Sequence, residues 1–217
     1  SRCVEQQIRY FESHQTLKPK ETMMKKSLLL LAALMLGGCA THWPETALLN
    51  PQVIPANQQY YSGNRITMEG VDKREAAYVF SIKHKEKAPV LVNSERPLNL
   101  LMAERLAEGL RSQGLEVGNS GTTNLTLVIS NAAVNVEEKT FTYVTKSRVS
   151  LQVIADFQGN RLTKQFNMSS SKESPSEPSM ADLESTLNLQ LGSVLQQIMA
   201  DDALRGYLKG QPNGAGV

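Results

Sequence analysis

The stretch FTYVTKSRVSLQVIADFQGNRLTKQFNM, residues 141–168, decides the fold. In its first half apolar and polar residues alternate, which is typical of a half-buried strand. The apolar residues that share one face there are Phe141, Tyr143, Val149, Leu151, Val153 and Ala155. Gln158-Gly159-Asn160 follows, and Leu162, Phe166 and Met168 then share a face again. The stretch therefore predicts an antiparallel β-hairpin that turns at Gly159.

Further strand and helix patterns lie on both sides of the hairpin. Short strands are expected at 65–71, 77–83 and 125–129. Between Pro97 and Gly114 the period changes, because Leu98, Met102, Leu106 and Leu110 recur at every fourth position, as in an amphipathic helix. Ser179 can cap a second helix together with Asp182. The apolar stripe of that second helix is Leu183, Leu187, Leu191, Val194 and Ile198. We therefore expect an α+β domain with two helices packed on one face of a mainly antiparallel sheet.

The strongest signal in the sequence lies near the N-terminus. Lys25 and Lys26 precede an apolar run at 27–36, and Gly37, Gly38 and Cys39 follow at once. This is the layout of a secretory signal peptide. The run has about half of the roughly 20 apolar residues that a membrane-spanning helix needs.

The sequence Leu36-Gly37-Gly38-Cys39 resembles the lipobox of bacterial lipoproteins. The resemblance implies that a peptidase recognises Leu36, Gly37 and Gly38, cuts before Cys39, and leaves that cysteine lipidated. The other interpretation, a buried cysteine after a core helix, is disfavoured because the run has no amphipathic period. Ala40 follows the cysteine where the usual inner-membrane retention signal is an aspartate, so the expected location is the outer membrane, facing the periplasm. The expected partner is therefore the membrane, to which the lipid on Cys39 anchors the protein.

These signals divide the chain into five expected parts. Residues 1–22 form a polar extension ahead of the signal, which we interpret as an over-extended gene start. Residues 23–38 are the signal peptide, 39–64 the lipidated cysteine and a flexible tether rich in Pro and Asn, 65–209 the periplasmic domain, and 210–217 a disordered tail. Within the tether, Trp43 is either an interfacial anchor or an incidental aromatic residue.

Composition and charge restrict the function. The chain has 217 residues, of which 41% are hydrophobic and 20% charged, which is ordinary for one globular domain. Six of the 23 basic and three of the 21 acidic side chains precede Cys39, so the expected mature protein carries 17 and 18 and a formal charge of −1. Nucleic acid is therefore not an expected partner.

Residues that could carry catalysis are few. After Cys39 the sequence has two histidines, His42 and His84, and neither has a neighbour at metal-ligand spacing. There is no phosphate-binding glycine loop, and no free thiol remains once Cys39 is lipidated. We therefore expect no catalytic, cofactor-binding or metal-binding residues, and no enzyme. Two polar segments could still bind a ligand: the charged cluster Asp72-Lys73-Arg74-Glu75, which also reads as a solvated loop, and the serine-rich run 169–178, which also reads as a flexible connector.

Taken together, several features resemble the YajG-type family of bacterial lipoproteins. These are the lipobox, Val71-Asp72-Lys73-Arg74 after the first strand, the helix before Gly114, the long hairpin and the last helix. The resemblance implies an envelope location and this fold, and the layout also resembles periplasmic lipoproteins that act as adaptors. We rank a non-catalytic adaptor for an envelope or cell-wall protein first, and a module that binds a small ligand or peptidoglycan fragment second. A hydrolase, which would need His84 to approach Asp72 or a serine, is third.

Overall fold

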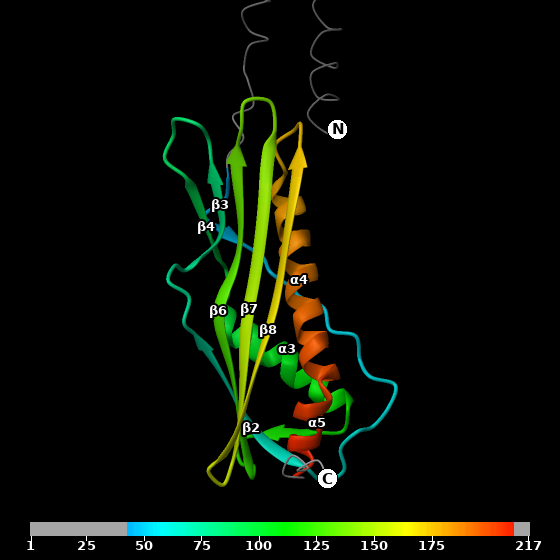
Figure 1. Ribbon diagram of the computed structural model, residues 1–217. Helices are drawn as coiled ribbons and strands as arrows, with labels where there is room; N and C mark the ends of the chain where they lie inside the picture. The colour runs from blue at the N-terminus through cyan, green and yellow to red at the C-terminus, as the bar shows by residue number, and fades with distance from the viewer. Residues whose placement is uncertain (1–42, 211–217) are drawn as a thin grey trace, which may run out of the picture. The chain divides into compact units, whose positions relative to one another are not determined.

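The computed structural model describes residues 43–210. Within them, eight strands form one mixed sheet, and three helices accompany it (Figure 1). The strands are β1 (Thr46–Ala47), β2 (Arg65–Asp72), β3 (Tyr78–Lys83), β4 (Val90–Ser94), β5 (Glu116–Gly118), β6 (Thr123–Glu138), β7 (Tyr143–Phe157) and β8 (Asn160–Ser174). The helices are α3 (Leu98–Ser112), α4 (Met180–Ala200) and α5 (Asp202–Leu208). The predicted α+β class is confirmed.

The long strand β6 organises the sheet. On one edge it pairs with β7 in antiparallel register, and β7 pairs in turn with β8. On its other edge the first half of β6 pairs with β2 and the second half with β3, both in parallel. The sheet therefore combines an antiparallel half, as the hairpin predicts, with a parallel half.

The strand predicted at 125–129 is only the first part of β6, which continues past a β-bulge to Glu138. The buried residues of β6 are Leu125, Leu127 and Ile129 before the bulge, and Ala132, Val134 and Val136 after it. The register shifts between Ile129 and Asn131. One extra residue moves the inward-facing set from odd to even positions, so the alternation in the sequence is interrupted in the middle of a continuous strand.

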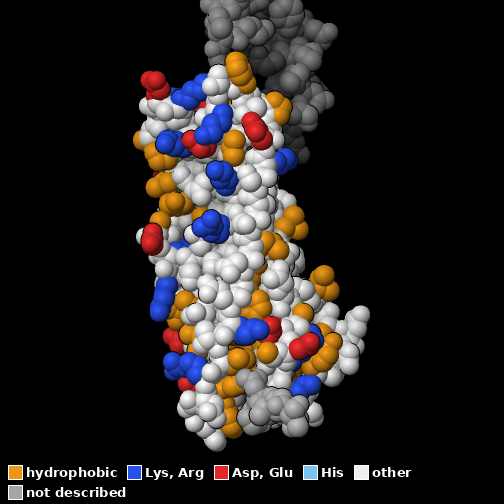
Figure 2. Space-filling model, in the orientation of Figure 1, with side chains coloured by type: hydrophobic (Ala, Val, Ile, Leu, Met, Phe, Trp, Pro, Cys, Tyr) orange, Lys and Arg blue, Asp and Glu red, His pale blue; other side chains and the backbone are white. Residues whose placement is uncertain are grey.

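All three helices pack on one face of the sheet, as Figure 1 shows. The apolar stripe of α3 and that of α4 are buried there, with Leu106 and Leu187 fully covered. Ser179 caps α4 in a reciprocal capping box with Asp182, as predicted. The opposite sheet face is solvated, and Figure 2 shows there mostly backbone and uncharged polar side chains, with scattered charged and hydrophobic side chains. This division positions the hydrophobic core between sheet and helices.

Three predicted local structures need correction. The serine-rich run is not a flexible connector at its start, because β8 continues through Ser174 in register with β7. Phe141 does not belong to the buried face of β7, since it lies in the turn before that strand and is 88% exposed. The described part of the expected tether, residues 43–64, is not free but packs against the domain. The extension 1–22, the signal peptide 23–38, residues 39–42 and the tail from 211 lie outside the described residues.

Candidate functional site

Two surfaces could bind a ligand or a partner: a notch in the sheet and a groove along α4. The notch forms where β6 changes partner. The pairing of β6 with β2 ends at Ile129 and its pairing with β3 begins at Val134. Residues 130–133 of β6 therefore have no strand beside them on that edge. The crossing segment between β2 and β3 passes over this gap, and a cavity of about 440 Å³ lies there.

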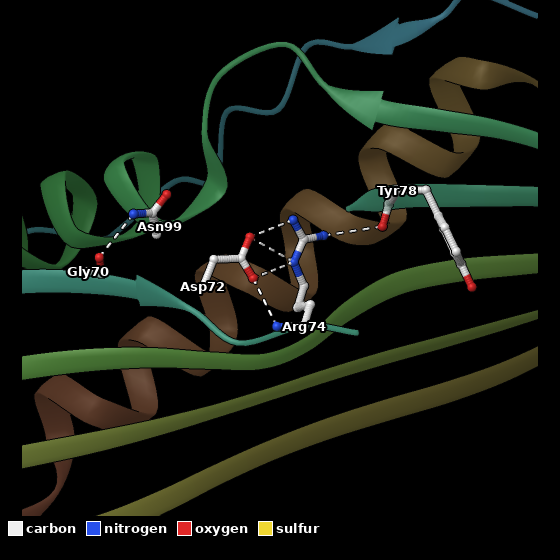
Figure 3. A network of polar contacts seen from close by, with 5 residues as sticks. All are labelled: Gly70, Asp72, Arg74, Tyr78 and Asn99. Atoms are coloured by element: carbon white, nitrogen blue, oxygen red, sulfur yellow. Dashed lines mark hydrogen bonds and ion pairs between the residues drawn. The ribbon is translucent and has the colours of Figure 1, made fainter. Parts of the chain in front are cut away.

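The charged cluster predicted from the sequence lines this notch. Figure 3 shows Asp72 and Arg74 facing each other where the chain leaves β2 and continues towards β3. The Arg74 guanidinium donates to both carboxylate oxygens of Asp72, at 2.8–3.2 Å, and to the backbone oxygen of Tyr78 at 3.2 Å. Its side chain is only 7% exposed. Arg74 is thus a structural cross-link between β2 and β3 rather than a solvated loop residue.

The pKa of Asp72 reflects this pairing. Partial burial opposes ionisation, but the side-chain and backbone hydrogen bonds from Arg74 outweigh it and lower the pKa of Asp72 below its usual 3.8. The neighbouring residues Lys73 and Glu75 are exposed at the rim of the cavity. The notch therefore offers an exposed charge of each sign beside the backbone of 130–133.

The second surface is created by the segment that the sequence predicts as a tether. From Ala47 to Val53 every second residue faces the core: Ala47, Leu49 and Pro51 are buried and Val53 is half-buried. The residues between them point outward. This two-residue alternation is the signal that sequence analysis missed, because the prolines and the polar residues favour a flexible reading.

A ladder of hydrogen bonds fastens the same segment to α4. The backbone N–H of Leu48 donates to Glu184 Oε1 at 3.0 Å, and that of Asn50 to Asn188 Oδ1 at 2.8 Å. Ile54 N–H donates to Gln196 Oε1 at 3.3 Å. Four residues of helix rise about 6.0 Å and two residues of extended chain about 6.6 Å. The two elements therefore stay in step along their length.

Gly192 occupies the remaining position of this ladder. A Cβ at Gly192 would meet the backbone oxygen of Gln52 far inside van der Waals contact. Beyond Ile54 the segment is held at its other end, where the backbone N–H groups of Tyr60 and Tyr61 both donate to the oxygen of Gln113. Residues 48–54 thus form a strap along α4, and we call them the strap.

A groove of about 460 Å³ runs between the strap and α4. Its walls include Ile54, 72% exposed, and Leu189, 69% exposed, while Leu48 nearby on the strap is 63% exposed. The other lining residues are Asn50, Gln52, Ser185, Asn188, Gly192, Ser193 and Gln196. None of the lining residues carries an ionisable side chain. Such a groove can bind apolar side chains, and its lining has no acid or base that could activate the hydroxyl of Ser185 or Ser193.

His84, the histidine weighed for a hydrolase, has a different environment. Its Nδ1 lies 3.2 Å from Glu138 Oε2 and its Nε2 3.4 Å from Glu177 Oε1. Both imidazole nitrogens therefore face carboxylates, and neither Asp72 nor a serine is among its polar partners within 43–210. Among these residues, no group of three or more His, Cys, Asp or Glu side chains is arranged to hold a metal ion.

The remaining predicted site residues, Leu36, Gly37, Gly38 and Cys39, and also His42, lie outside the described residues. Within the described part of the chain, no helix is long and apolar enough to cross a membrane.

The fold defines the class of protein first. The crystal structure of protein XCC0632 from Xanthomonas campestris, of family DUF330, superposes with a TM-score of 0.56 over 78% of this chain and 100% of that one, at 8% sequence identity. This likeness places the chain among α+β domains of that fold. A family model described as "Uncharacterized lipoprotein" matches residues 51–209, and the chain belongs to this lipoprotein family.

The resemblance to YajG-type lipoproteins is confirmed. The chain is 26% identical over 190 residues to the uncharacterized lipoprotein YajG of Escherichia coli strain K12, covering 86% of this chain and 98% of that protein. Membership of this family indicates a membrane-anchored protein of the cell envelope.

Proposed function

We propose that this protein is a lipid-anchored, non-catalytic adaptor that faces the periplasm from the outer membrane and binds a partner protein through the strap–α4 groove. The groove carries the proposal, because two large aliphatic side chains, Ile54 and Leu189, are exposed on its walls, and Leu48 is exposed at the other end of the strap. Single exposed apolar residues are ordinary, whereas a cluster beside a concave surface is typical of a protein-binding site.

The chemistry of the groove favours a protein partner. Its polar residues are amides and hydroxyls, which suit the backbone and neutral side chains of another protein. It contains no charge that would select a phosphate or carboxylate ligand. The expected occupant is an apolar side chain, or a short row of them, projecting from a neighbouring envelope protein.

The anchor belongs to the same proposal. The Cys39 thiol receives diacylglycerol, a peptidase that recognises Leu36-Gly37-Gly38 then cuts before Cys39, and Ala40 directs the protein to the outer membrane. Mass spectrometry of the membrane-extracted protein should find acyl chains on an N-terminal Cys39, and membrane fractionation should place the protein with outer-membrane markers. An unmodified Cys39 within a longer chain would contradict the anchor.

The adaptor function can be tested by site-specific photocrosslinking in intact cells. A photoreactive amino acid at Leu189 should give one discrete protein adduct, and the same residue at Asn167, exposed on β8, is the matched control. The adduct should disappear in the Cys39→Ser variant and in Ile54→Ser, which removes one wall of the groove. Identical adducts from positions 189 and 167 would reject the groove as the binding surface.

The notch supports a second candidate, a module that binds a peptide-bearing cell-wall fragment. Its cavity combines the exposed Lys73 with Asn131 and with the unpaired strand edge at 130–133. Titration of a disaccharide–tetrapeptide fragment should then raise the melting temperature, and the rise should be lost in Lys73→Ala but kept in Lys85→Ala. No rise with the wild-type protein would leave the adaptor as the single proposal.

A further inference from the structure

We infer that one end of the sheet, the end that carries the β6–β7 turn, lies against the phospholipid bilayer, and that Phe141 enters its interfacial region. The inference rests on the proposed lipidation of Cys39 and adds an orientation to it. It concerns a surface distinct from the strap–α4 groove.

The first step is the length of chain between anchor and domain. The ordered packing of the chain begins by Trp43, which contacts the core, so only residues 40–42 lie between it and Cys39. The four residue-to-residue steps from Cys39 to Trp43 span at most about 14 Å when fully extended. A tether running to residue 64 would have let the domain move far from the membrane and turn freely. The connection between Cys39 and Trp43 is too short to allow such movement.

The second step is where Trp43 lies in the sheet. Thr46 pairs with Asn93 in parallel register, and Glu45 O accepts a hydrogen bond from Asn93 N–H at 3.0 Å. Continued backward, this register brings Trp43 to the level of Val90, where β4 leaves the turn that joins it to β3. In Figure 1 the first coloured residues lie beside β3 and β4.

The third step identifies the residues on the other strands that lie level with Val90. Val90 pairs with Ile82, Ile82 with Val136, and Val136 with Thr145. Beyond Val136, β6 and its turn continue for a few residues, which extends the sheet by about 10–13 Å at 3.3 Å per residue. The maximum span from Cys39 to Trp43 is similar to the length of the sheet beyond Val136. The β6–β7 turn therefore reaches the bilayer surface to which Cys39 is attached.

The fourth step is the structure of the turn itself. Phe141 is 88% exposed, the largest exposure among the large hydrophobic residues in the described part of the chain. The turn around it is held in place, because Lys139 N–H donates to Thr142 O at 2.7 Å and Thr142 Oγ1 donates to Glu173 at 2.6 Å. An aromatic residue presented on a braced turn fits the headgroup region of a bilayer, where aromatic side chains are enriched.

Lysines surround the same end. Lys83, Lys85 and Lys87 are exposed on the neighbouring end of β3 and its turn, and none of them is paired with a carboxylate among residues 43–210. Among the nearby carboxylates, Glu86 is exposed between Lys85 and Lys87, whereas Glu137 and Glu138 are paired with Lys139 and His84. Unpaired lysines can approach anionic lipid headgroups, which favours this end over an uncharged one.

Tryptophan fluorescence in vesicles tests the orientation. The protein has one tryptophan, so Trp43→Phe provides a background for Phe141→Trp and, as the matched control, for Asn160→Trp. Asn160 is exposed at the other end of the sheet, about 45 Å away along β7. The lipidated proteins are reconstituted into phosphatidylethanolamine–phosphatidylglycerol vesicles that contain lipid brominated in its acyl chains.

The expected result is quenching and a shift to shorter wavelength for the tryptophan at 141, with neither effect for the one at 160. A lipidated protein that floats with the vesicles but shows no quenching at 141, or equal quenching at both positions, overturns the orientation while leaving the anchor intact. If mass spectrometry instead finds no lipid on Cys39, both the anchor and the orientation are overturned. Circular dichroism confirms that each variant is folded.

Discussion

At the scale of single residues, Gly192 lets the backbone of the strap approach α4 closely. A helix interior normally disfavours glycine by about 1 kcal/mol relative to alanine. Here the absence of a side chain lets the backbone oxygen of Gln52 approach the helix. The glycine therefore weakens the helix locally but allows the strap to pack against it.

The first prediction compares two helical glycines. Gly192→Ala should lower the free energy of unfolding by about 1–2 kcal/mol, since overpacking against a backbone atom outweighs the gain in helix propensity. Gly206→Ala in α5 should raise it by about 0.5–1 kcal/mol, because nothing lies within 4 Å of a Cβ there. Urea unfolding measures both. Equal stabilisation by the two changes would show that the strap does not pack on α4.

The second prediction concerns the ion pair in the notch. Asp72→Asn leaves the nearly buried Arg74 without its carboxylate partner, which should cost about 2 kcal/mol at pH 7. Glu116→Gln is the control, because its ion pair with Arg65 is more than half exposed on both sides and should contribute less than about 1 kcal/mol.

This ion pair also predicts a pH dependence. Hydrogen bonds from Arg74 hold the pKa of folded Asp72 below 3.8. The stabilisation is therefore fully present above pH 3.8, the pKa of the unfolded chain, and is lost as the pH falls through the lower folded pKa. Urea unfolding between pH 7 and pH 2.5 should show wild type and Asp72→Asn converging at the acid end. A constant difference would indicate that Asp72 contributes by packing alone.

At the scale of elements, α4 depends on local and on long-range signals. Its start is local: the Ser179 side chain accepts from Asp182 N–H, and the Asp182 carboxylate accepts in return from Ser179. Three polar side chains on α4, Glu184, Asn188 and Gln196, instead accept hydrogen bonds from the strap, and Gly192 in the same row makes room for its backbone. The capping box was predictable from two residues, Ser179 and Asp182, whereas the contacts of the other polar side chains with the strap were not.

The third prediction removes the cap. Ser179→Ala should destabilise the protein by about 1 kcal/mol, which corresponds to a fall of about 2–4 °C in melting temperature for a domain of this size. Ser185→Ala, on an exposed position in the same helix, should leave the melting temperature the same or slightly higher. Calorimetry distinguishes the two. A similar loss in both variants would argue against a specific capping role.

Edge strand β8 shows why the serine-rich run was misread. Its second half has no apolar alternation, so nothing in the local pattern indicates a strand. Pairing with β7 extends it, and a buried polar contact supports it, since Gln190 Nε2 on α4 donates to Ser147 Oγ at 2.5 Å and to Ser170 Oγ at 3.0 Å. Its partners come from other parts of the chain.

At the scale of the whole molecule, the sheet should not be equally stable throughout. Strand β7 has a partner on both edges, and β6 has one along most of both, while β8 pairs only with β7. Local opening releases first those amides that have few buried neighbours and no second strand.

The fourth prediction follows from this difference. In hydrogen-exchange mass spectrometry, peptides from β6 and β7 should be the slowest to exchange. Those from the second half of β8, residues 169–174, should exchange well before them. The strap should exchange slowly in the wild-type protein and faster in Gly192→Ala. A strap that exchanges at once in the wild-type protein would contradict the ordered packing of residues 48–54.

The sequence alone determined the β7–β8 hairpin in outline, the two long helices with their buried stripes, the cap at Ser179 and the α+β class. These follow from periods of two and of about four residues and from turn and cap residues, which act between near neighbours in the chain. Only the tertiary structure decided that β6 pairs with β2 and then with β3, that the change of partner opens a notch lined by Arg74, and that residues 48–54 are a strap on α4. Each of these depends on which distant segment supplies a hydrogen-bond partner, and local periodicity carries no information about that choice.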